Sequence, residues 1–455
     1  MKGTYNLTED PITSTLMKLT WPIIATNFIQ TTYGLVDMIW VGRLGSGPVA
    51  AIGTASFFVN LAAALFSMIA IGSGVKVAHS VGAGKEEEAK QYIHNGFLLS
   101  ILLGMIYMAF ILIAKNRLIA FFDLGDAKIE QMASQFLVIS MIGTIFTFFN
   151  TLFSLVLNAL GNSRKPFRVY MAGFLVNMAL DPLLIFGAGG FNGLGVLGAA
   201  LATLIANFLV SALFLLNTQN IALFTRPFLL NTAKMREVVK MGLPITVQRV
   251  TFIVISIIIA KIIVTWGAEA IAVQKVGIQI ESISYMTIGG LQGAIAAFIG
   301  QNFGAAKFER IQQGYWKALT ITILFGAVIS VVFIVFPKSV FSLFLNDGSS
   351  LALGENYLRI LGYSQLFMCL ELMTVGAFNG IGKTYIPPIF SIVFTALRIP
   401  MALFLSGPFG LNGVWMAIAI SSVLKGVVLV FWFLLSLRNL RSSFANVKLS
   451  TAEGR

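Results

Sequence analysis

Residues 20–42, "TWPIIATNFIQTTYGLVDMIWVG", form a run of mostly apolar residues in which Asp37 is the only charged side chain. A helix crosses the hydrocarbon core of a membrane with about 20 such residues, and its backbone must then satisfy its own hydrogen bonds. The stretch therefore predicts a membrane-spanning helix. A carboxyl group inside a membrane-spanning helix is costly in free energy, so Asp37 is a candidate functional residue.

The rest of the 455-residue chain has the same character. Hydrophobic residues make up 57% of it, charged residues 11%, and the mean hydropathy is +0.87, whereas a soluble domain has about 25% charged residues. We therefore predict an all-α integral membrane protein. Its twelve predicted spans are residues 15–42, 48–80, 91–114, 129–159, 167–187, 194–217, 238–265, 270–301, 312–336, 351–379, 385–406 and 412–437.

The charged residues indicate how the chain crosses the membrane. The net charge is +13, but Lys and Arg lie in short gaps between the apolar runs, so nucleic-acid binding is not expected. Most of them fall on one side of the predicted topology, and the positive-inside rule then places both termini in the cytoplasm. We expect a multi-pass protein of the plasma (inner) membrane.

Enzyme motifs and metal-ligand patterns do not emerge from the sequence. Cys369 is the one cysteine, the chain has 2 histidines, and neither a phosphate-binding loop nor a nucleophile motif is found. We expect no catalytic residue, no metal and no cofactor.

The two halves of the chain resemble each other. "LTWPI" around Pro22 returns as "MGLPI" around Pro244, an offset of 222, and "VGAGKEEEA" returns at the same offset as "FGAAKFERI". "LNALGNSRKP" and "FNGIGKTYIP" are related by an offset of 221, while "LDPLLIFG" and "RIPMALFLSG" align at 218. The repeat predicts two six-helix bundles with the same orientation: a first lobe (1–217), a cytoplasmic linker (218–237) and a second lobe with a cytoplasmic tail (238–455).

Such a parallel repeat is typical of secondary transporters, whose substrate sites lie between or within the repeated bundles. A channel, a receptor or a membrane enzyme is the alternative.

The motifs resemble those of a known family. "LTWPIIATNFIQTTYGLVDMIWVGRLG", "SVGAGKEEEA", "LNALGNSRKP" and "LVNMALDPLLIFG" are similar to the MATE (multidrug and toxic compound extrusion) transporters, most closely the DinF-like branch. The resemblance implies N- and C-lobes related by a pseudo-two-fold axis along the membrane normal, with a V-shaped central cavity. It also implies export of cationic or lipophilic drugs driven by inward H+ or Na+ flow, in a protein that we expect to be monomeric in the lipid.

One position departs from the family's NorM-like branch. That branch carries an acidic residue in span seven, where this chain has Phe252. The difference favours H+ over Na+ as the coupling ion.

Span one carries a polar stripe. Gln30, Tyr33 and Asp37 are three or four positions apart, so they share one face of a helix. Span five repeats the pattern with Asn177 and Asp181. Because the two carboxyl groups lie at similar depth, we expect them to meet in a pocket of the first lobe. The repeat aligns Asp37 with Ile259 and Asp181 with Ile399, so the repeated scaffold does not need either carboxyl group.

A buried pair of carboxyl groups suits proton coupling. Desolvation favours the neutral acid, and a second carboxyl group nearby helps to retain one proton. Antiport then needs only that proton and drug favour different states. The predicted proton-coupling residues are Asp37, Asp181, Asn177 and Thr203, and the predicted drug contacts are Asp37, Tyr33, Gln30, Asn150, Met68 and Phe149.

Two other interpretations of these residues remain open. Asp37 is either a proton carrier or a structural hydrogen-bonding group, and Asp181 is either part of the pocket or interfacial. Pro22 and Pro182 each remove a helix hydrogen bond, so they are predicted bending points, or else tolerated packing kinks.

The second lobe offers an alternative ion site. Glu371, Gln274 and Glu281 are its candidate ligands, but basic groups such as Arg249 and Arg398 lie in the same spans, which favours mutual ion pairing. The rival functions are a Na+-coupled exporter that uses Glu371, a lipid-linked saccharide flippase with a strongly cationic cavity, and a receptor or structural protein without gradient-driven flux.

Overall fold

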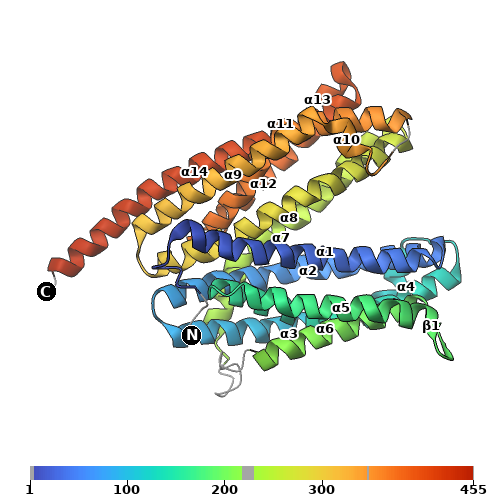
Figure 1. Ribbon diagram of the computed structural model, residues 1–455, viewed down its shortest axis with the longest axis horizontal. Coiled ribbons are helices and arrows are strands. Elements are labelled where there is room, and N and C mark those ends of the chain that lie inside the picture. Colours follow the sequence, from blue (N-terminus) through green and yellow to red (C-terminus); the bar gives the residue numbers. More distant parts are fainter. Residues whose placement is uncertain (1–4, 218–229, 346–347, 454–455) are drawn as a thin grey trace. The chain divides into compact units, whose positions relative to one another are not determined.

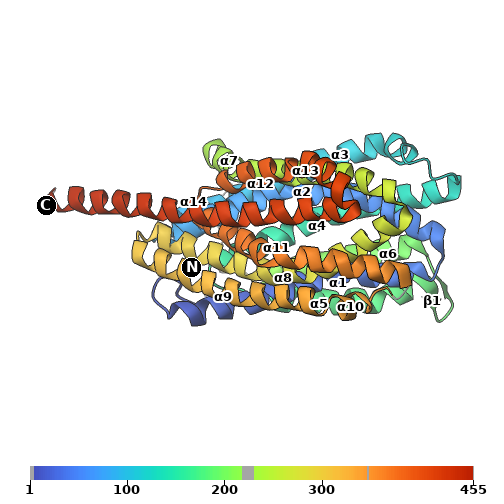
Figure 2. The same ribbon diagram turned by 90° about the horizontal axis from the view of Figure 1, so that it is seen from above.

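The computed structural model describes residues 5–217, 230–345 and 348–453. These residues are almost entirely helical, as Figures 1 and 2 show. The elements are α1 (Ile12–Gly42), α2 (Ser46–Gly82), α3 (Glu86–Ala120), α4 (Ala127–Ala159), α5 (Arg164–Phe186), β1 (Gly187–Ala188), β2 (Phe191–Asn192), α6 (Val196–Asn217), α7 (Thr232–Ile263), η2 (Val264–Trp266), α8 (Ala268–Gly304), α9 (Phe308–Val335), α10 (Pro337–Phe341), α11 (Gly348–Gly380), α12 (Ile386–Ala396), α13 (Arg398–Phe409) and α14 (Leu411–Glu453).

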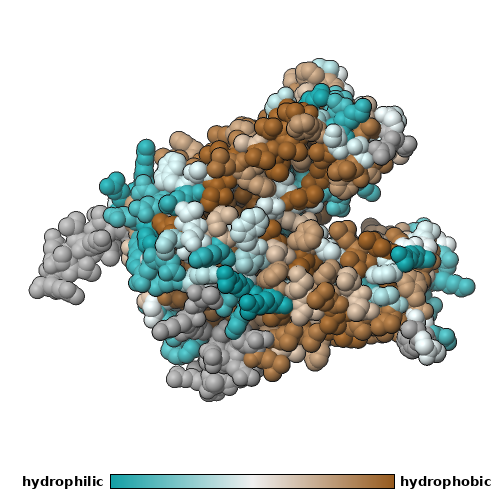
Figure 3. Space-filling model, in the orientation of Figure 1, coloured by the Kyte–Doolittle hydropathy of each residue, from teal (hydrophilic) through white to brown (hydrophobic). Residues whose placement is uncertain are grey.

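The helices confirm an all-α membrane protein. Eleven segments of the described part are long and apolar enough to cross a membrane, and α12 and α13 together form one of them. The 31-residue α1 is not among the eleven; the polar stripe that marks it as a functional candidate also lowers its hydropathy. Figure 3 shows hydrophobic side chains along the middle of the helices and hydrophilic ones toward their ends.

One predicted boundary is wrong, and one predicted span contains a break. Helix α7 begins at Thr232, so the last residues of the predicted linker (218–237) are helical, while residues 218–229 lie outside the described part. The predicted span at 385–406 is broken at Leu397 between α12 and α13. Pro400 explains the break, because it has no N–H to donate to the carbonyl of residue 396. Pro22 and Pro182, by contrast, lie inside uninterrupted α1 and α5.

The internal repeat extends to the backbone conformation of the turns. Gly84 has a φ of 71°, and Ala306, its equivalent at the offset of 222, has a φ of 55°. Gly161 and Gly382, which are equivalent at the offset of 221, have φ angles of 79° and 75°. An alanine rarely adopts a positive φ, so Ala306 keeps this conformation because the repeated turn requires it.

The φ angles of equivalent turn residues also correct the alignment of the last helices of the two repeats. The glycines that precede α6 and α14, Gly195 and Gly410, have φ angles of 56° and 57°, and they are related by an offset of 215 rather than 218. The change from 221 to 215 is accounted for by the β1–β2 hairpin at positions 187–192, since only Gly410 separates α13 from α14. At the offset of 221 for α5, Asp181 aligns with Ala402 rather than Ile399. The aligned residue is still apolar.

The chain forms two compact units. Unit 1 contains Ala25–Leu243, and unit 2 contains Tyr5–Ile24 and Pro244–Arg455. The first part of α1 thus packs within unit 2, although the sequence predicts that it belongs to the first lobe (1–217). The first part of α7 packs within unit 1. The chain passes from one unit to the other between Ile24 and Ala25 in α1 and between Leu243 and Pro244 in α7.

Close backbone contacts hold these exchanged segments. In unit 1, a Cβ atom added to Gly242 of α7 would collide with the carbonyl oxygen of Met68 on α2. In unit 2, a Cβ on Gly290 of α8 would lie 3.1 Å from the carbonyl oxygen of Thr20 on α1. The two pairs are related by the offset of 222. Each exchanged helix start therefore packs against the second helix of the other repeat.

Candidate functional site

The polar residues predicted on spans one, five and six meet in unit 1. The Thr203 hydroxyl on α6 donates a hydrogen bond of 3.0 Å to Asp37 Oδ2 on α1. On α5, Asn177 Nδ2 donates one of 3.1 Å to Asp181 Oδ1. Asn177 and Asp181 are fully buried, and the carboxyl groups of Asp37 and Asp181 are close enough to hydrogen-bond to each other.

This buried cluster contains more acceptors than donors. Asp37 Oδ1, Asp181 Oδ2 and Asn177 Oδ1 are buried, and none accepts a hydrogen bond from the described residues. Two ionised carboxylates cannot bond to each other, because both are acceptors only. One added proton changes this, since a protonated carboxyl group can donate to its neighbour. The arrangement therefore provides a place for a proton.

The remaining polar residues of α1 also face α5. The Tyr33 hydroxyl lies beside Gly173, where an added Cβ would be 2.7 Å from its oxygen, and the Tyr33 ring packs edge-on against Phe174 at 5.3 Å. Gln30 lies within hydrogen-bonding reach of the Tyr170 hydroxyl. The predicted stripe thus contacts α5 through Tyr33 and Gln30, and Gly173 makes room for Tyr33.

Asn150 lies elsewhere in unit 1, and both the nitrogen and the oxygen of its amide group are hydrogen-bonded. Its Nδ2 donates to the carbonyl of Asn207 at 3.0 Å, and its Oδ1 accepts from the Ser211 hydroxyl at 2.7 Å. It is completely buried. The geometry gives Asn150 the role of joining α4 to α6, and a drug would have to displace these bonds to reach it.

Met68 and Phe149 pack against the hydrophobic core of unit 1. The Phe149 ring lies 4.3 Å from that of Phe97 and 5.4 Å from that of Phe153, and the Met68 backbone contacts the start of α7 through Gly242. Neither is brought to the Asp37–Asp181 cluster by any of the contacts described above. Their predicted drug contacts remain predictions.

Comparison with known proteins identifies the chain. A family model described as MatE matches residues 22–183 and again 244–404, once in each repeat. The chain belongs to the MatE family. Members of this family, the MATE transporters, are transporters and not enzymes.

Two curated relatives of this MatE protein match almost its whole length. A probable multidrug resistance protein NorM from Thermotoga maritima is 25% identical over 92% of this chain and 91% of its own. An FAD transporter from Shewanella oneidensis is 24% identical over 94% of this chain and 95% of its own.

A solved multidrug resistance MATE family transporter superposes with a TM-score of 0.87 at 22% identity, covering 97% of this chain and 99% of the other. This similarity supports the two-lobe fold.

In unit 2 of this MatE protein, the three residues of the alternative ion site have separate partners. Glu371 Oε2 forms an ion pair of 2.9 Å with Lys425 Nζ, and both side chains are 7% exposed. Gln274 accepts a bond from the Trp415 indole at 3.1 Å, and Glu281 accepts one from the Tyr357 hydroxyl at 2.9 Å.

Ion pairing in this lobe was predicted from its basic residues, but Lys425 was not among the predicted partners. Its place in an apolar run, "SSVLKGVVLVF", was the available signal, since a buried lysine in a span needs a counter-charge.

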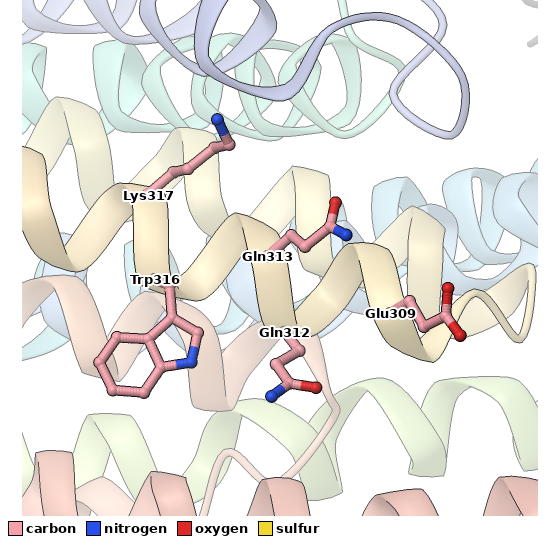
Figure 4. Close-up of a pocket in the computed structure, with 5 residues that line it drawn as sticks. All are labelled: Glu309, Gln312, Gln313, Trp316 and Lys317. Carbon is pink, nitrogen blue, oxygen red and sulfur yellow. The ribbon is translucent and has the colours of Figure 1, made fainter.

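A depression on the surface of α9 has no part in either cluster. Its lining residues all come from this one helix, as Figure 4 shows, and they are Glu309, Gln312, Gln313, Trp316 and Lys317. Lys317 is bonded to the Thr13 hydroxyl at 3.2 Å.

Proposed function

We propose that this MatE protein is a secondary active exporter that exchanges cationic or lipophilic drugs for inward-moving H+. Family membership and a relative described as a probable multidrug resistance protein support multidrug export. The observation that carries the coupling ion is the Asp37–Asp181 pair, whose facing oxygens lack a donor that one proton would supply. We also propose that both termini are cytoplasmic and that the protein acts as a monomer in the plasma membrane.

The exchange follows from the charge of the pair. Without a proton, the two carboxylates attract a cationic drug and provide its counter-ion. With a proton, they hydrogen-bond to each other, and Thr203 and Asn177 satisfy the outer oxygens. The drug then loses part of its electrostatic attraction and leaves. Proton and drug therefore favour different states of one site, which is the condition for antiport.

Na+ coupling through the second lobe is the competing proposal. It would use Glu371, but Lys425 already neutralises that carboxylate at 2.9 Å. A Na+ ion would have to displace a buried ammonium group. The acidic pocket of unit 1 likewise does not favour a flippase for pyrophosphate-linked saccharides, which would need cationic side chains.

The test is dye flux in proteoliposomes under an imposed pH gradient or an imposed Na+ gradient. We expect a pH gradient to drive efflux of a rhodamine or ethidium dye in the wild type. Asp37→Asn and Asp181→Asn should each abolish the gradient-driven flux, because an amide cannot carry the proton. Asp126→Asn is the matched control: Asp126 caps the start of α4, where its side chain accepts from the Lys128 N–H at 2.8 Å, and asparagine caps equally well.

Flux that responds only to Na+, or that Glu371→Gln abolishes while Asp37→Asn leaves it intact, would replace this proposal with the Na+-coupled one. Absence of flux under either gradient would favour a receptor or structural protein.

A further inference from the structure

Arg398 occupies the position in the second repeat that Asn177 occupies in the first. The offset of 221 that relates α5 to α12 and α13 aligns these two residues. The other members of the acidic pocket align with apolar residues: Asp37 with Ile259, Asp181 with Ala402, and Thr203 with Ile418 at the offset of 215 for α14. At these four aligned positions, the second repeat thus carries one guanidinium group and no carboxyl group.

The guanidinium group is held by neutral partners. Its Nε donates to the Ser421 hydroxyl at 2.6 Å and its Nη2 to the Ser422 hydroxyl at 3.2 Å, both from α14. The ring of Phe252 lies 5.9 Å from its Cζ. These contacts fix the orientation of the side chain, which is 7% exposed.

No carboxylate balances this charge at short range. Within the described part of the chain, none of the Arg398 nitrogens lies within 4.0 Å of a carboxylate oxygen. Glu371 is paired with Lys425, and Glu281 accepts a hydrogen bond from Tyr357; both carboxylates act on Arg398 only through space, without a direct contact. A charge buried in a membrane protein without a close counter-ion is costly, and such residues are usually kept for function.

One nitrogen remains available. Nη1 of Arg398 makes no hydrogen bond to any described residue, and it is not among the fully buried polar atoms that lack a partner. It therefore keeps some exposed surface. A guanidinium group presents its donors in a planar fork that matches a carboxylate.

We propose that Arg398 binds the carboxylate group of a zwitterionic transported molecule. The inference deepens the proposed function and rests on it, because it supplies the second repeat with a substrate contact of opposite sign to the Asp37–Asp181 pair. Ser421 and Ser422 position the guanidinium group.

The test compares two dyes that differ in one group. Rhodamine 19 has a free carboxylate, and rhodamine 6G is its ethyl ester. Binding of each to the full-length protein in detergent is measured by fluorescence polarisation, so the result does not depend on coupling to any gradient. We expect Arg398→Gln to weaken rhodamine 19 binding about tenfold or more, the loss of one charge-assisted hydrogen bond, and to change rhodamine 6G binding less than about twofold.

Two further variants complete the test. Arg398→Lys keeps the positive charge but loses the planar pair of donors. Its loss of affinity for rhodamine 19 should therefore lie between those of the wild type and Arg398→Gln. Arg359→Gln is the matched control, since Arg359 is paired with Glu355 at 2.7 Å, and it should change neither affinity.

A wild type that does not bind rhodamine 19 would overturn the inference, and so would an Arg398→Gln protein in which both dyes weaken equally or neither weakens. If Arg398→Gln weakens binding of rhodamine 19 but not of rhodamine 6G, and a pH gradient still fails to drive dye flux, the result counts against the coupling proposal alone.

Discussion

At the scale of single residues, the Thr203 hydroxyl is the group on α6 that contacts the acidic pair. We predict that Thr203→Val, which keeps the shape and removes the hydroxyl, lowers pH-driven dye flux about tenfold. The reason is that Asp37 Oδ2 loses a hydrogen bond of 3.0 Å, and bonds to charged groups contribute about 1.5–3 kcal/mol. Initial flux rates in proteoliposomes provide the measurement.

Thr144→Val is the control for this substitution. Thr144 is also buried, but its hydroxyl bonds to the Ser140 carbonyl of its own helix at 2.8 Å. Its flux should stay within about twofold of the wild type, since helix-internal hydroxyl bonds contribute little. Equal losses in the two variants would show that the Thr203 effect is one of packing and not of the carboxyl pair.

At the scale of helices, the contact between the start of α7 and α2 depends on Gly242. We predict that Gly242→Ala lowers the thermal stability of the detergent-solubilised protein, because the added methyl group would collide with the Met68 carbonyl and overpacking costs about 1–3 kcal/mol. Gly53→Ala, also within a helix, has nothing within 4 Å of the added atom, and should raise stability slightly. A melting temperature that changes equally in both variants would contradict the role of this contact.

At the scale of the whole molecule, the exchanged helix starts should interlock the two halves of the chain. We predict that cleavage at a protease site inserted between residues 218 and 229 leaves the two fragments associated on size-exclusion chromatography. The reason is that each fragment supplies a helix segment to the other unit: residues 5–24 to unit 2, and residues 232–243 to unit 1. In unit 1, Glu237 accepts from the Tyr92 hydroxyl at 2.7 Å and pairs with Lys76.

A tag on one fragment makes the measurement direct, because the untagged fragment should co-elute with it. Gly242→Val in the same cleaved protein should weaken the association. Separation of the fragments without this substitution would show that the exchanged segments do not hold the halves together.

The sequence alone was sufficient to predict the all-helical membrane class, the repeat, and the set of Asp37, Asp181, Asn177 and Thr203 as neighbours. Hydropathy and helical periodicity are local properties, and residues on one helix face must contact whatever covers that face. Whether Asn150, Met68 and Phe149 contact a drug depends on which neighbours cover their sides of the helices. Asn150 is hydrogen-bonded to α6.

Only the tertiary structure decided the register of the last helices, the exchange of helix starts between the two units, and the pairing of Glu371 with Lys425. Each of these depends on residues far apart in the sequence, and spacing along one helix carries no information about them. The offset of 218 failed because the β1–β2 hairpin separates two helices whose motifs are only weakly similar, and the matching φ angles of Gly195 and Gly410 resolved it. The sequence determined which side chains enter the membrane, because their transfer free energies are intrinsic; the packing of the helices decided which of them have partners.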